Sequence, residues 1–256
     1  CALFSYDLAV DLKPQLNDLA DLIVANNVFN HANDPVDFAQ GVQELLSDNG
    51  TFVFEVPYWY NTITDEKFDQ IYHEHLSYFT VKSACNLLKL AGLTVYDVEW
   101  VDYHGGSIRV YASKDKRKGS KSVQEHISKE EDANLFDPQQ YTEFMKSIKR
   151  KRDFWLSELY RISGEGYPIV AIGAAAKGNT FLNYYNLDNS IIDYVTDTSE
   201  HKVGKYTPLS RIPILTDTEV FSKYDKVYAF ILSWNISDLI KGKLQAINKN
   251  IEFLIK

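Results

Sequence analysis

The sequence predicts an α/β fold made of two sheets, of which the first is mostly parallel and ends in an antiparallel hairpin. Residues 21–56 read as strand, helix and strand, an order that implies a parallel pair joined by a crossover helix. Residues 94–101 and 107–113 read as two strands with a short glycine-containing connection, which predicts a hairpin. From residue 166 onward, strand and helix patterns alternate again, so a small doubly wound second domain is expected.

The opening part of the chain is predicted to contain two strands. Residues 2–6 have a strand pattern, so the chain opens directly in what looks like a fold interior. Residues 21–28 form a short apolar run that ends in polar residues, which is typical of a buried strand.

The crossover helix has a clear start and a clear apolar face. Asp34 is a capping residue and Pro35 is favoured at the first helical position. Asn49 and Gly50 are predicted to end the helix, and residues 51–56 form the next strand. The inward face consists of Phe38, Val42, Leu45 and Leu46.

A second helix precedes the hairpin. Thr80 caps it and Gly92 ends it. Residues 102–106 are short enough to join the two following strands as an antiparallel pair. The helix is expected to turn Ala84, Leu87, Leu88 and Ala91 inward.

A helical connector is expected between the two domains. Residues 114–121 are basic and contain Gly and Ser, so they are the best candidate for a linker. Residues 122–162 are helical in pattern, with a break near Asp137 and Pro138. One stripe of the connector contains Phe144, Ile148, Trp155, Leu159 and Ile162. The predicted boundaries are 1–115, 116–165 and 166–256.

The second domain has the alternation of a small doubly wound sheet. A strand at 168–173 turns into a helix that runs through Asn186. The later elements are strands at 191–196, 212–215 and 226–234, a helix at 237–248 and a last strand at 251–255.

Composition excludes several classes of protein. With 45% hydrophobic residues in 256, the chain can bury a substantial core. The net charge of -8 argues against nucleic acid as the main partner but leaves room for a small phosphorylated ligand. Cys1 and Cys85 are too few for a disulfide framework or a thiolate zinc site, and we predict no metal site. With no signal peptide and no apolar run of about 18 residues, we expect a cytoplasmic protein without membrane attachment.

The densest group of reactive side chains is Tyr72, His73, Glu74 and His75. It places a phenol, two imidazoles and a carboxylate side by side, next to aromatic residues that can exclude water. A lone histidine would be interpreted as part of an exposed loop tip. The four side chains together favour general acid–base chemistry.

The strand-to-helix turn of the second domain contains Gly173 and Gly178. Its amides and the helix start favour an anion, and Lys177 adds positive charge. It is not a Walker A motif, because Asn179 stands where that motif has lysine. The alternative is a tight turn that needs small residues. Asp197 ends the next strand, where a ribose partner often lies, and this favours ligand binding slightly.

Three further polar groups follow predicted strands or join them, where ligand crevices form in α/β sheets. Each has an equally simple structural reading, namely a glycine turn, helix capping beside a surface histidine, or a proline turn after a strand. The groups are His104, Gly105, Gly106 and Ser107 with Arg109; Asn26, Asn27 and His31; and Glu55, Pro57 and Tyr58.

Taken together, these segments resemble the S-adenosylmethionine-dependent sugar C-methyltransferases, which act on nucleotide-linked deoxy-4-ketohexoses. The resemblance covers nearly the whole chain. It rests on residues 25–28 with His31, 55–58, 71–79, 104–110, 173–180, 212–214 and 234–235. It implies the C-terminal part of a class I methyltransferase Rossmann sheet, ending in an antiparallel hairpin, followed by a Rossmann-like domain.

The resemblance also implies a reaction. A base removes the proton next to the sugar ketone, and the enolate attacks the sulfonium methyl group. His75 is the implied base, Glu74 orients or tunes it, and Tyr72 is the alternative base or a hydrogen-bond donor. The implied donors to the enolate oxygen are Asn27, His31 and Tyr58. Other implied substrate contacts are His73, His104, Gly105, Gly106, Ser107, Arg109, Lys177 and Asn179, and Asn26 is the implied cofactor contact.

The chain departs from this family at its start. The cysteine-rich zinc domain and the glycine-loop strand that normally come first are not in this sequence. We therefore expect a truncated form of the enzyme; the alternatives are assembly with a partner chain or a nucleotide-sugar-binding protein without catalysis. Self-association is also expected, because an incomplete sheet leaves an uncovered edge. An NAD-type dehydrogenase is disfavoured by the incomplete glycine pattern.

Overall fold

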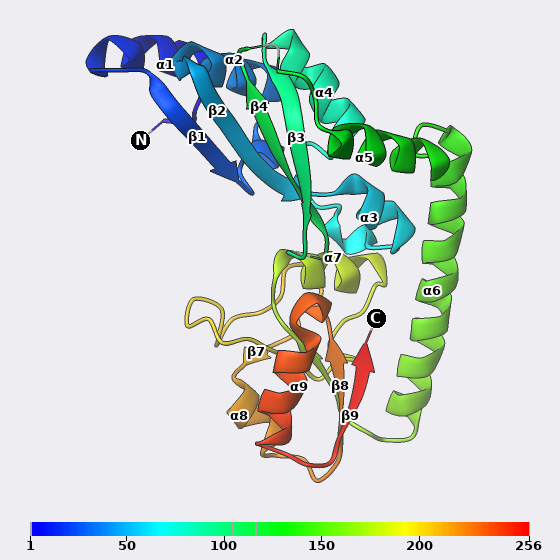
Figure 1. Cartoon of the computed structure of the whole chain (residues 1–256). Helices are drawn as coiled ribbons and strands as arrows, with labels where there is room; N and C mark the ends of the chain where they lie inside the picture. The colour runs from blue at the N-terminus through cyan, green and yellow to red at the C-terminus, as the bar shows by residue number, and fades with distance from the viewer. Residues whose placement is uncertain (1, 104, 116, 256) are drawn as a thin grey trace. The chain divides into compact units, whose positions relative to one another are not determined.

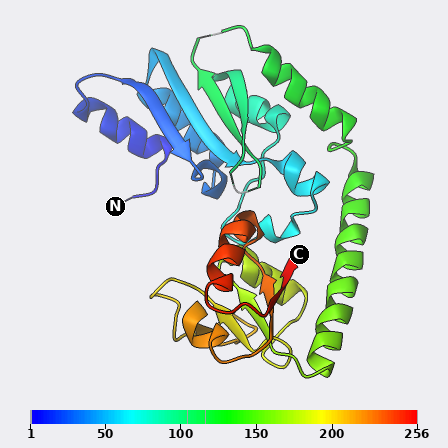
Figure 2. The same ribbon diagram turned by 60° about the horizontal axis from the view of Figure 1, so that its bottom comes forward.

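A computed structural model of the chain describes residues 2–103, 105–115 and 117–255 (Figures 1 and 2). His104, one of the predicted site residues, lies outside the described residues. The chain divides into two compact units. The first contains the residues up to Lys67 together with His73–Phe144, and the second contains Phe68–Tyr72 together with the residues from Met145 onward.

The first unit is built on a four-stranded sheet with the order β1-β2-β4-β3. Its strands are β1 (Ala20–Asn26), β2 (Leu46–Pro57), β3 (Thr94–Val101) and β4 (Ser107–Ser113). β1 and β2 are parallel, whereas β4 runs antiparallel to both β2 and β3. The predicted crossover pair and hairpin are therefore confirmed, and the hairpin strands have the predicted bounds.

Helices cover one face of this sheet, where Phe52, Phe54 and Val110 are fully buried. They include α2 (Pro35–Leu45) and α4 (Val81–Leu90), which Figures 1 and 2 show behind the strands. The predicted caps are present: Asp34 accepts hydrogen bonds from two amides of α2, and Thr80 forms a capping box with Ser83. On the other face, Leu22 and Val24 of β1 are more than half exposed, at 58% and 54%.

The expected strand at residues 2–6 is wrong. Ser5 instead caps α1 (Tyr6–Leu12) by accepting a hydrogen bond from the Leu8 amide at 3.2 Å. Phe4 is held by edge-on packing against the ring of Phe38 in α2, with 4.8 Å between ring centroids. A side-chain cap and an aromatic contact thus override the apolar pattern of the segment. A 3-10 turn, Lys13–Gln15, follows α1.

The expected end of the crossover helix at Asn49 and Gly50 is also wrong. α2 ends at Leu45, and β2 already begins at Leu46, which pairs with Ala20. The register then shifts, so that Leu22 pairs with Thr51. Gly50 lies inside this irregularity, where an added Cβ would come within 2.8 Å of the Ala20 carbonyl oxygen. The glycine therefore lies in a strand irregularity rather than at a helix end.

The helical pattern expected at residues 122–162 is present in the structure. It consists of α5 (Lys121–Asp132) and α6 (Pro138–Gly164), with the break at the predicted position. The expected stripe of α6 lies inward, with Phe144, Ile148, Leu159 and Ile162 buried and Trp155 partly buried. Before this connector, the chain between β2 and α4 contains α3 (Trp59–Thr64) and a 3-10 turn, Phe68–Gln70.

The second unit is a five-stranded parallel sheet with the order β7-β6-β5-β8-β9. Its strands are β5 (Ile169–Ile172), β6 (Tyr194–Thr196), β7 (Ile214–Leu215), β8 (Val227–Ile231) and β9 (Ile251–Ile255). Its helices are α7 (Ala176–Tyr184), α8 (Asp217–Phe221) and α9 (Ser237–Gln245). The chain leaves β5 toward β6 and later returns to the other side of β5 as β8, so the doubly wound prediction is confirmed.

Several strands of this unit are shorter than predicted. β8 ends at Ile231 instead of 234, because the amides of Leu232 and Ser233 both turn to the carbonyl oxygen of Ile172. A 3-10 turn, Trp234–Ile236, then leads into α9. The apolar pattern continued past the strand because the turn itself is partly buried.

Candidate active site

The structure brings two of the predicted histidines together in the first unit. His31 ends the 3-10 turn Phe29–His31 that follows β1, and His75 lies in the irregular segment before α4. Their rings meet edge to face, with 5.1 Å between centroids and an angle of 86°. The carbonyl oxygen of Asn30 accepts hydrogen bonds from the amides of Leu76 and Ser77, at 3.0 and 3.1 Å, and so fixes the segment after His75.

The other members of the predicted motif have different environments. His75 is buried, with 8% exposed, whereas the side chains of His73 and Glu74 are 84% and 55% exposed. Glu74 lies 3.9 Å from His73, at the outer limit of an ion pair. Tyr72 belongs to the second unit. Of the two histidines in the motif, His75 is therefore the one shielded from water, as acid–base catalysis needs.

Asn30 is a polar residue of this site that the sequence analysis did not single out. It is 2% exposed, and its amide oxygen is buried without a hydrogen-bond partner among the described residues. Buried amide oxygens are normally paired, so this atom is available to a donor. The only signal in the sequence was its place beside His31, in a run rich in asparagine after a strand.

Tyr58 has a structural environment. It is fully buried, and its hydroxyl donates a hydrogen bond to the Glu130 carboxylate at 2.9 Å. Burial and the negative charge of Glu130 raise the pKa of Tyr58 well above its ordinary value. Its proton is therefore engaged within the fold, which does not support the implied role as a donor to an enolate.

Arg109 is engaged by acidic neighbours on the open face of the sheet. Its guanidinium binds one oxygen of the buried Glu55 carboxylate through two nitrogens, at 2.9 and 3.2 Å, and lies 3.4 Å from Glu99. Asn26 pairs with Glu55 across the sheet and is exposed, and the amide of Asn27 donates to the Glu55 carbonyl oxygen at 2.7 Å. Asn27 has a φ of 53°, so the chain turns sharply at the end of β1.

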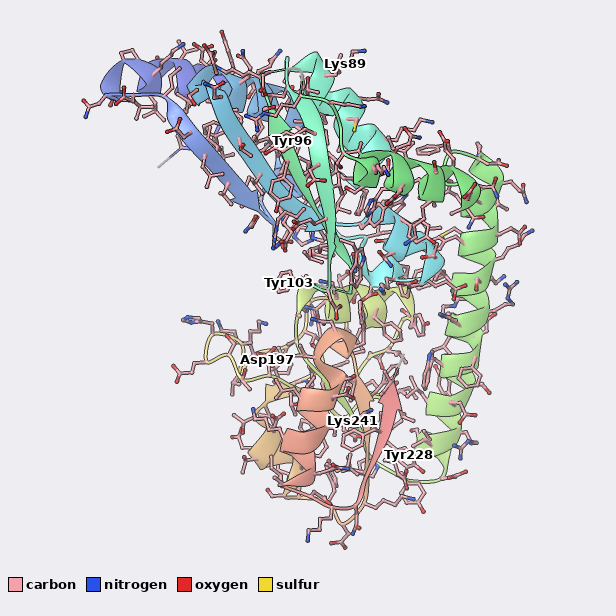
Figure 3. All side chains as sticks on the ribbon, viewed as in Figure 1. Lys89, Tyr96, Tyr103, Asp197, Tyr228 and Lys241 are labelled. Carbon is pink, nitrogen blue, oxygen red and sulfur yellow. The ribbon has the colours of Figure 1, made fainter. Side chains whose placement is uncertain are left out.

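The glycines of the hairpin connection are needed by the turn itself. Gly105 and Gly106 have φ of 81° and 110°, and a Cβ on Gly106 would lie 2.8 Å from the Asn61 side chain. Ser107 is fully buried, and its hydroxyl donates to the Tyr103 carbonyl oxygen at 3.0 Å. Tyr103, labelled with Tyr96 in Figure 3, follows β3 at this end of the hairpin. These contacts support the turn reading of the segment.

A second polar group lies within the second unit. Trp234 donates its indole N–H to the Asp69 carboxylate at 3.0 Å, and Asp69 also acts electrostatically on Lys177 in the first turn of α7. Burial lowers the pKa of the Lys177 ammonium, while the charge of Asp69 opposes that change. Asn179 has a buried amide oxygen without a partner among the described residues. Asp69 was not assigned a role from the sequence.

The strand-to-helix turn after β5 is tightly closed by the protein itself. Gly173 has a φ of 100°, and its amide donates to the Thr196 carbonyl oxygen at 2.8 Å. The next amide, of Ala174, donates to the Asp197 carboxylate at 2.9 Å. A Cβ on Gly178 would lie 2.7 Å from the Gly173 carbonyl oxygen. Two amides of the expected anion nest are thus already paired, and both glycines are required for packing.

No cluster of three or more His, Cys, Asp or Glu side chains that could hold a metal occurs in the described parts of the chain. At the carboxyl end of β1, the exposed amide of Asn26 can contact a cofactor. No helix among the described residues is long and apolar enough to span a membrane.

Comparison with known proteins finds two family models along the chain. Residues 102–256 match the family model of the C-methyltransferase C-terminal domain, and residues 5–98 match that of a methyltransferase domain. The chain therefore belongs to the family of S-adenosylmethionine-dependent C-methyltransferases. The strand order of the first unit agrees, since its sheet is a methyltransferase Rossmann sheet that ends in an antiparallel hairpin.

One curated relative is C-methyltransferase NovU from Streptomyces niveus, which is 32% identical over 241 residues. The match covers 93% of this chain and 57% of the relative, so the chain spans little more than half of that protein. Similar solved structures include LepI with SAM and the O-methyltransferase NcsB1 with S-adenosyl-L-homocysteine. LepI is 15% identical over 38% of this chain and 26% of its own length, and NcsB1 is 17% identical over 38% of this chain and 30% of its own length. Both have a TM-score of 0.31. Similarities this slight do not indicate a substrate or a reaction for this chain.

Proposed function

We propose that this chain forms part of an S-adenosylmethionine-dependent C-methyltransferase that acts on a nucleotide-linked 4-keto deoxysugar. The observation that carries the proposal is the buried His75, paired with His31 inside the methyltransferase unit. The family assignment and the similarity to a C-methyltransferase support the reaction class. The nucleotide-linked sugar is supported by the resemblance of the motifs around these histidines.

In the proposed reaction, a neutral His75 ring takes the proton from the carbon next to the ketone. The electrons of the broken C–H bond form the enolate double bond, and negative charge develops on the former ketone oxygen. A buried base suits this step, because the surrounding side chains exclude water that would otherwise compete for the base.

The enolate oxygen requires a hydrogen-bond donor, and His31 lies against the base. Asn30 can accept a hydrogen bond through its unpaired amide oxygen, and its carbonyl oxygen holds the backbone that follows His75. When bound, S-adenosylmethionine supplies the electrophilic methyl group. Asn26, which ends β1 and is exposed, would contact it.

A second candidate function is nucleotide-sugar binding without catalysis. It is favoured by the group formed by Asp69, Trp234 and Lys177, which is complete within the second unit and does not involve His75. The two candidates differ in one observable step. Only the enzyme removes a proton from the substrate.

The test is proton exchange in heavy water. The chain is incubated with a thymidine-diphosphate-linked 4-keto-6-deoxyhexose, with and without S-adenosylmethionine, and the proton next to the ketone is followed by NMR. Loss of that proton signal faster than in buffer supports base catalysis, and a new carbon-bound methyl group supports transfer. Sugar binding with no exchange and no methylation would favour the second candidate. A chain that shows no sugar binding and no exchange would exclude both candidates.

A further inference from the structure

The chain crosses from the second unit into the first shortly before the predicted base. Phe68–Tyr72 belongs to the second unit, and the first unit resumes at His73. His75 therefore follows this crossing closely, in a segment that is neither helix nor strand. Because the segment is short and irregular, the conformations open to it depend on what holds it at each end.

The end in the first unit is held by backbone hydrogen bonds. The carbonyl oxygen of Asn30 accepts hydrogen bonds from the amides of Leu76 and Ser77, at 3.0 and 3.1 Å. Asn30 is 2% exposed, so these bonds form at a buried residue. The two amides report on the order of the segment, because a bonded amide exchanges its hydrogen with solvent only when the structure around it opens.

The end in the second unit is held by aromatic contacts. Phe68 begins the 3-10 turn Phe68–Gln70, and its ring packs against the core of the second unit. Its ring centroid lies 4.9 Å from that of Tyr184 and 6.0 Å from those of Phe181 and Tyr185, at the end of α7. Contacts between aromatic rings at these distances favour one arrangement of the turn.

Asp69 adds a buried charge to the same turn. It is 2% exposed, and its carboxylate accepts a hydrogen bond from the indole N–H of Trp234 at 3.0 Å. Burial lowers the pKa of the Lys177 ammonium, and the charge of Asp69 opposes this change. A buried carboxylate is stable only while such partners remain, so the turn leaves the second unit only at a large cost in free energy.

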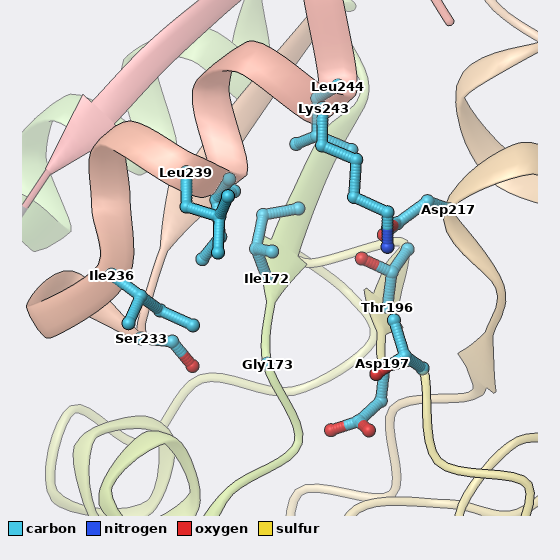
Figure 4. Close-up of a pocket in the computed structure, with 12 residues that line it drawn as sticks. Ile172, Gly173, Thr196, Asp197, Asp217, Ser233, Ile236, Leu239, Lys243 and Leu244 are labelled. Carbon is cyan, nitrogen blue, oxygen red and sulfur yellow. The ribbon is translucent and has the colours of Figure 1, made fainter.

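Trp234 is itself held in place by the sheet of the second unit. It begins the 3-10 turn after β8, where the amide of Ser233 donates to the carbonyl oxygen of Ile172 at 3.3 Å. Ser233 and Ile236, which flank Trp234 in the sequence, line a cavity of this unit beside Ile172 (Figure 4). The donor that binds Asp69 is therefore part of a turn that is fixed to the end of β5.

We propose that Asp69 is a positioning residue for the reaction: by binding Trp234, it holds the chain that enters the first unit and so keeps His75 in its reactive position. The inference rests on the proposed function for the role of His75. Asp69 acts through the chain that joins it to the base. Once this end is released, the segment gains conformational freedom, and the base spends less time in the geometry that proton transfer needs.

The test compares variants of the whole chain by hydrogen–deuterium exchange, read by mass spectrometry on peptides that cover residues 71–79. Trp234→Phe keeps an aromatic ring and removes the donor. Asp69→Leu keeps the branched shape and removes both the charge and the acceptor, whereas the conservative variant Asp69→Asn keeps an acceptor for the indole. The matched control is Trp100→Phe, because Trp100 donates its indole N–H to Asn61 at 3.1 Å within the first unit.

We expect the amides of Leu76 and Ser77 to exchange about tenfold faster in Trp234→Phe and Asp69→Leu, as follows from the loss of one hydrogen bond to a charged group. Asp69→Asn should lie between these variants and the wild type, and Trp100→Phe should match the wild type. In the proton-exchange assay with the sugar, kcat should fall by a similar factor while KM changes by less than about twofold, because a displaced base affects the chemical step alone. A residue that only stabilised the fold would lower the thermal midpoint without this separation of kcat from KM.

Failure of this inference is distinct from failure of the proposed function. Unchanged amide exchange at Leu76 and Ser77 in both Trp234→Phe and Asp69→Leu would overturn the inference, even if the chain removes the proton from the sugar. Faster amide exchange with an unaltered kcat would overturn the positioning role as well. A wild type that removes no proton would contradict the proposed function, and the amide exchange alone would then decide whether Asp69 orders this segment. If Asp69→Leu does not fold, Trp234→Phe and Asp69→Asn supply the same comparison.

Discussion

The carboxylate of Glu130 accepts a hydrogen bond from the hydroxyl of Tyr58 at 2.9 Å, and both side chains are fully buried. The same carboxylate accepts the amides of Val81 and Lys82, in the first turn of α4. Glu130 belongs to α5, so one buried anion joins the end of β2, the start of α4 and the connector helix. The charge is tolerated because three donors and the positive end of a helix surround it.

Replacing Glu130 with glutamine should destabilise the first unit. The glutamine side chain lacks the negative charge that the three donors face, and its NH₂ group cannot accept a hydrogen bond. We therefore expect the free energy of unfolding to fall by about 1–3 kcal/mol. The control is Glu131→Gln, since Glu131 is 49% exposed and pairs only at the surface with Lys82. The control should change stability by less than about 0.5 kcal/mol. Urea unfolding measures both, and equal effects of the two variants would contradict a structural role for Glu130.

Tyr58 should make stability fall at alkaline pH. Burial and Glu130 raise its pKa above the ordinary value of 10.0, so above that pH the unfolded chain releases the proton while the folded chain keeps it. Its contribution is therefore complete below pH 10 and is lost as pH rises, by at most about 1.4 kcal/mol per pH unit. Tyr58→Phe removes this contribution. Between pH 9 and about 11, unfolding free energies should decline more steeply in the wild type than in the variant; parallel curves would refute the assignment.

His75→Asn should abolish proton exchange at the carbon next to the ketone. Loss of a general base typically lowers a rate by about 10²–10⁴-fold, and asparagine cannot accept the proton. His201→Asn makes the same change at an exposed histidine of the second unit and should leave the exchange rate unaltered. Circular dichroism checks that the buried substitution leaves the fold intact. A folded His75→Asn variant that retains more than a tenth of the exchange rate would exclude His75 as the base.

Most of the fold was predictable because its signals are local. Asp34 with Pro35, and Thr80 with Gly92, define helices that the structure reproduces, and the hairpin strands match their predicted bounds. The errors occur where a contact from another element decides. Phe4 packs on Phe38 instead of pairing in a sheet. Gly50 leaves room for the Ala20 carbonyl oxygen of the neighbouring strand, where a side chain would clash.

The candidate site was less predictable, because adjacent residues of one motif differ in burial. His73 and His75 are indistinguishable by type and spacing, yet one is exposed and the other buried. The ring contact between His75 and His31 joins positions far apart in the sequence, and so does the hydrogen bond from Tyr58 to Glu130. No periodic pattern in the sequence can reveal that a buried oxygen, such as the Thr196 hydroxyl, lacks a hydrogen-bond partner among the described residues. Such features depend on the three-dimensional neighbours of each atom.

Gly173→Ala should destabilise the second unit, whereas Gly164→Ala should not. Gly173 has a φ of 100°, and a Cβ there would lie 2.0 Å from the Ser233 hydroxyl, so alanine would be strained and displaced; we expect a loss of about 1–3 kcal/mol. Gly164 ends α6 with nothing within 4 Å of its added Cβ, and alanine there should be neutral or stabilising by up to about 1 kcal/mol. Adding Ser233→Ala to Gly173→Ala relieves the clash but not the backbone strain, so it should restore only part of the loss. Full recovery in the double variant, measured by urea unfolding, would show that the backbone conformation at Gly173 costs alanine nothing and that the glycine serves only to admit Ser233.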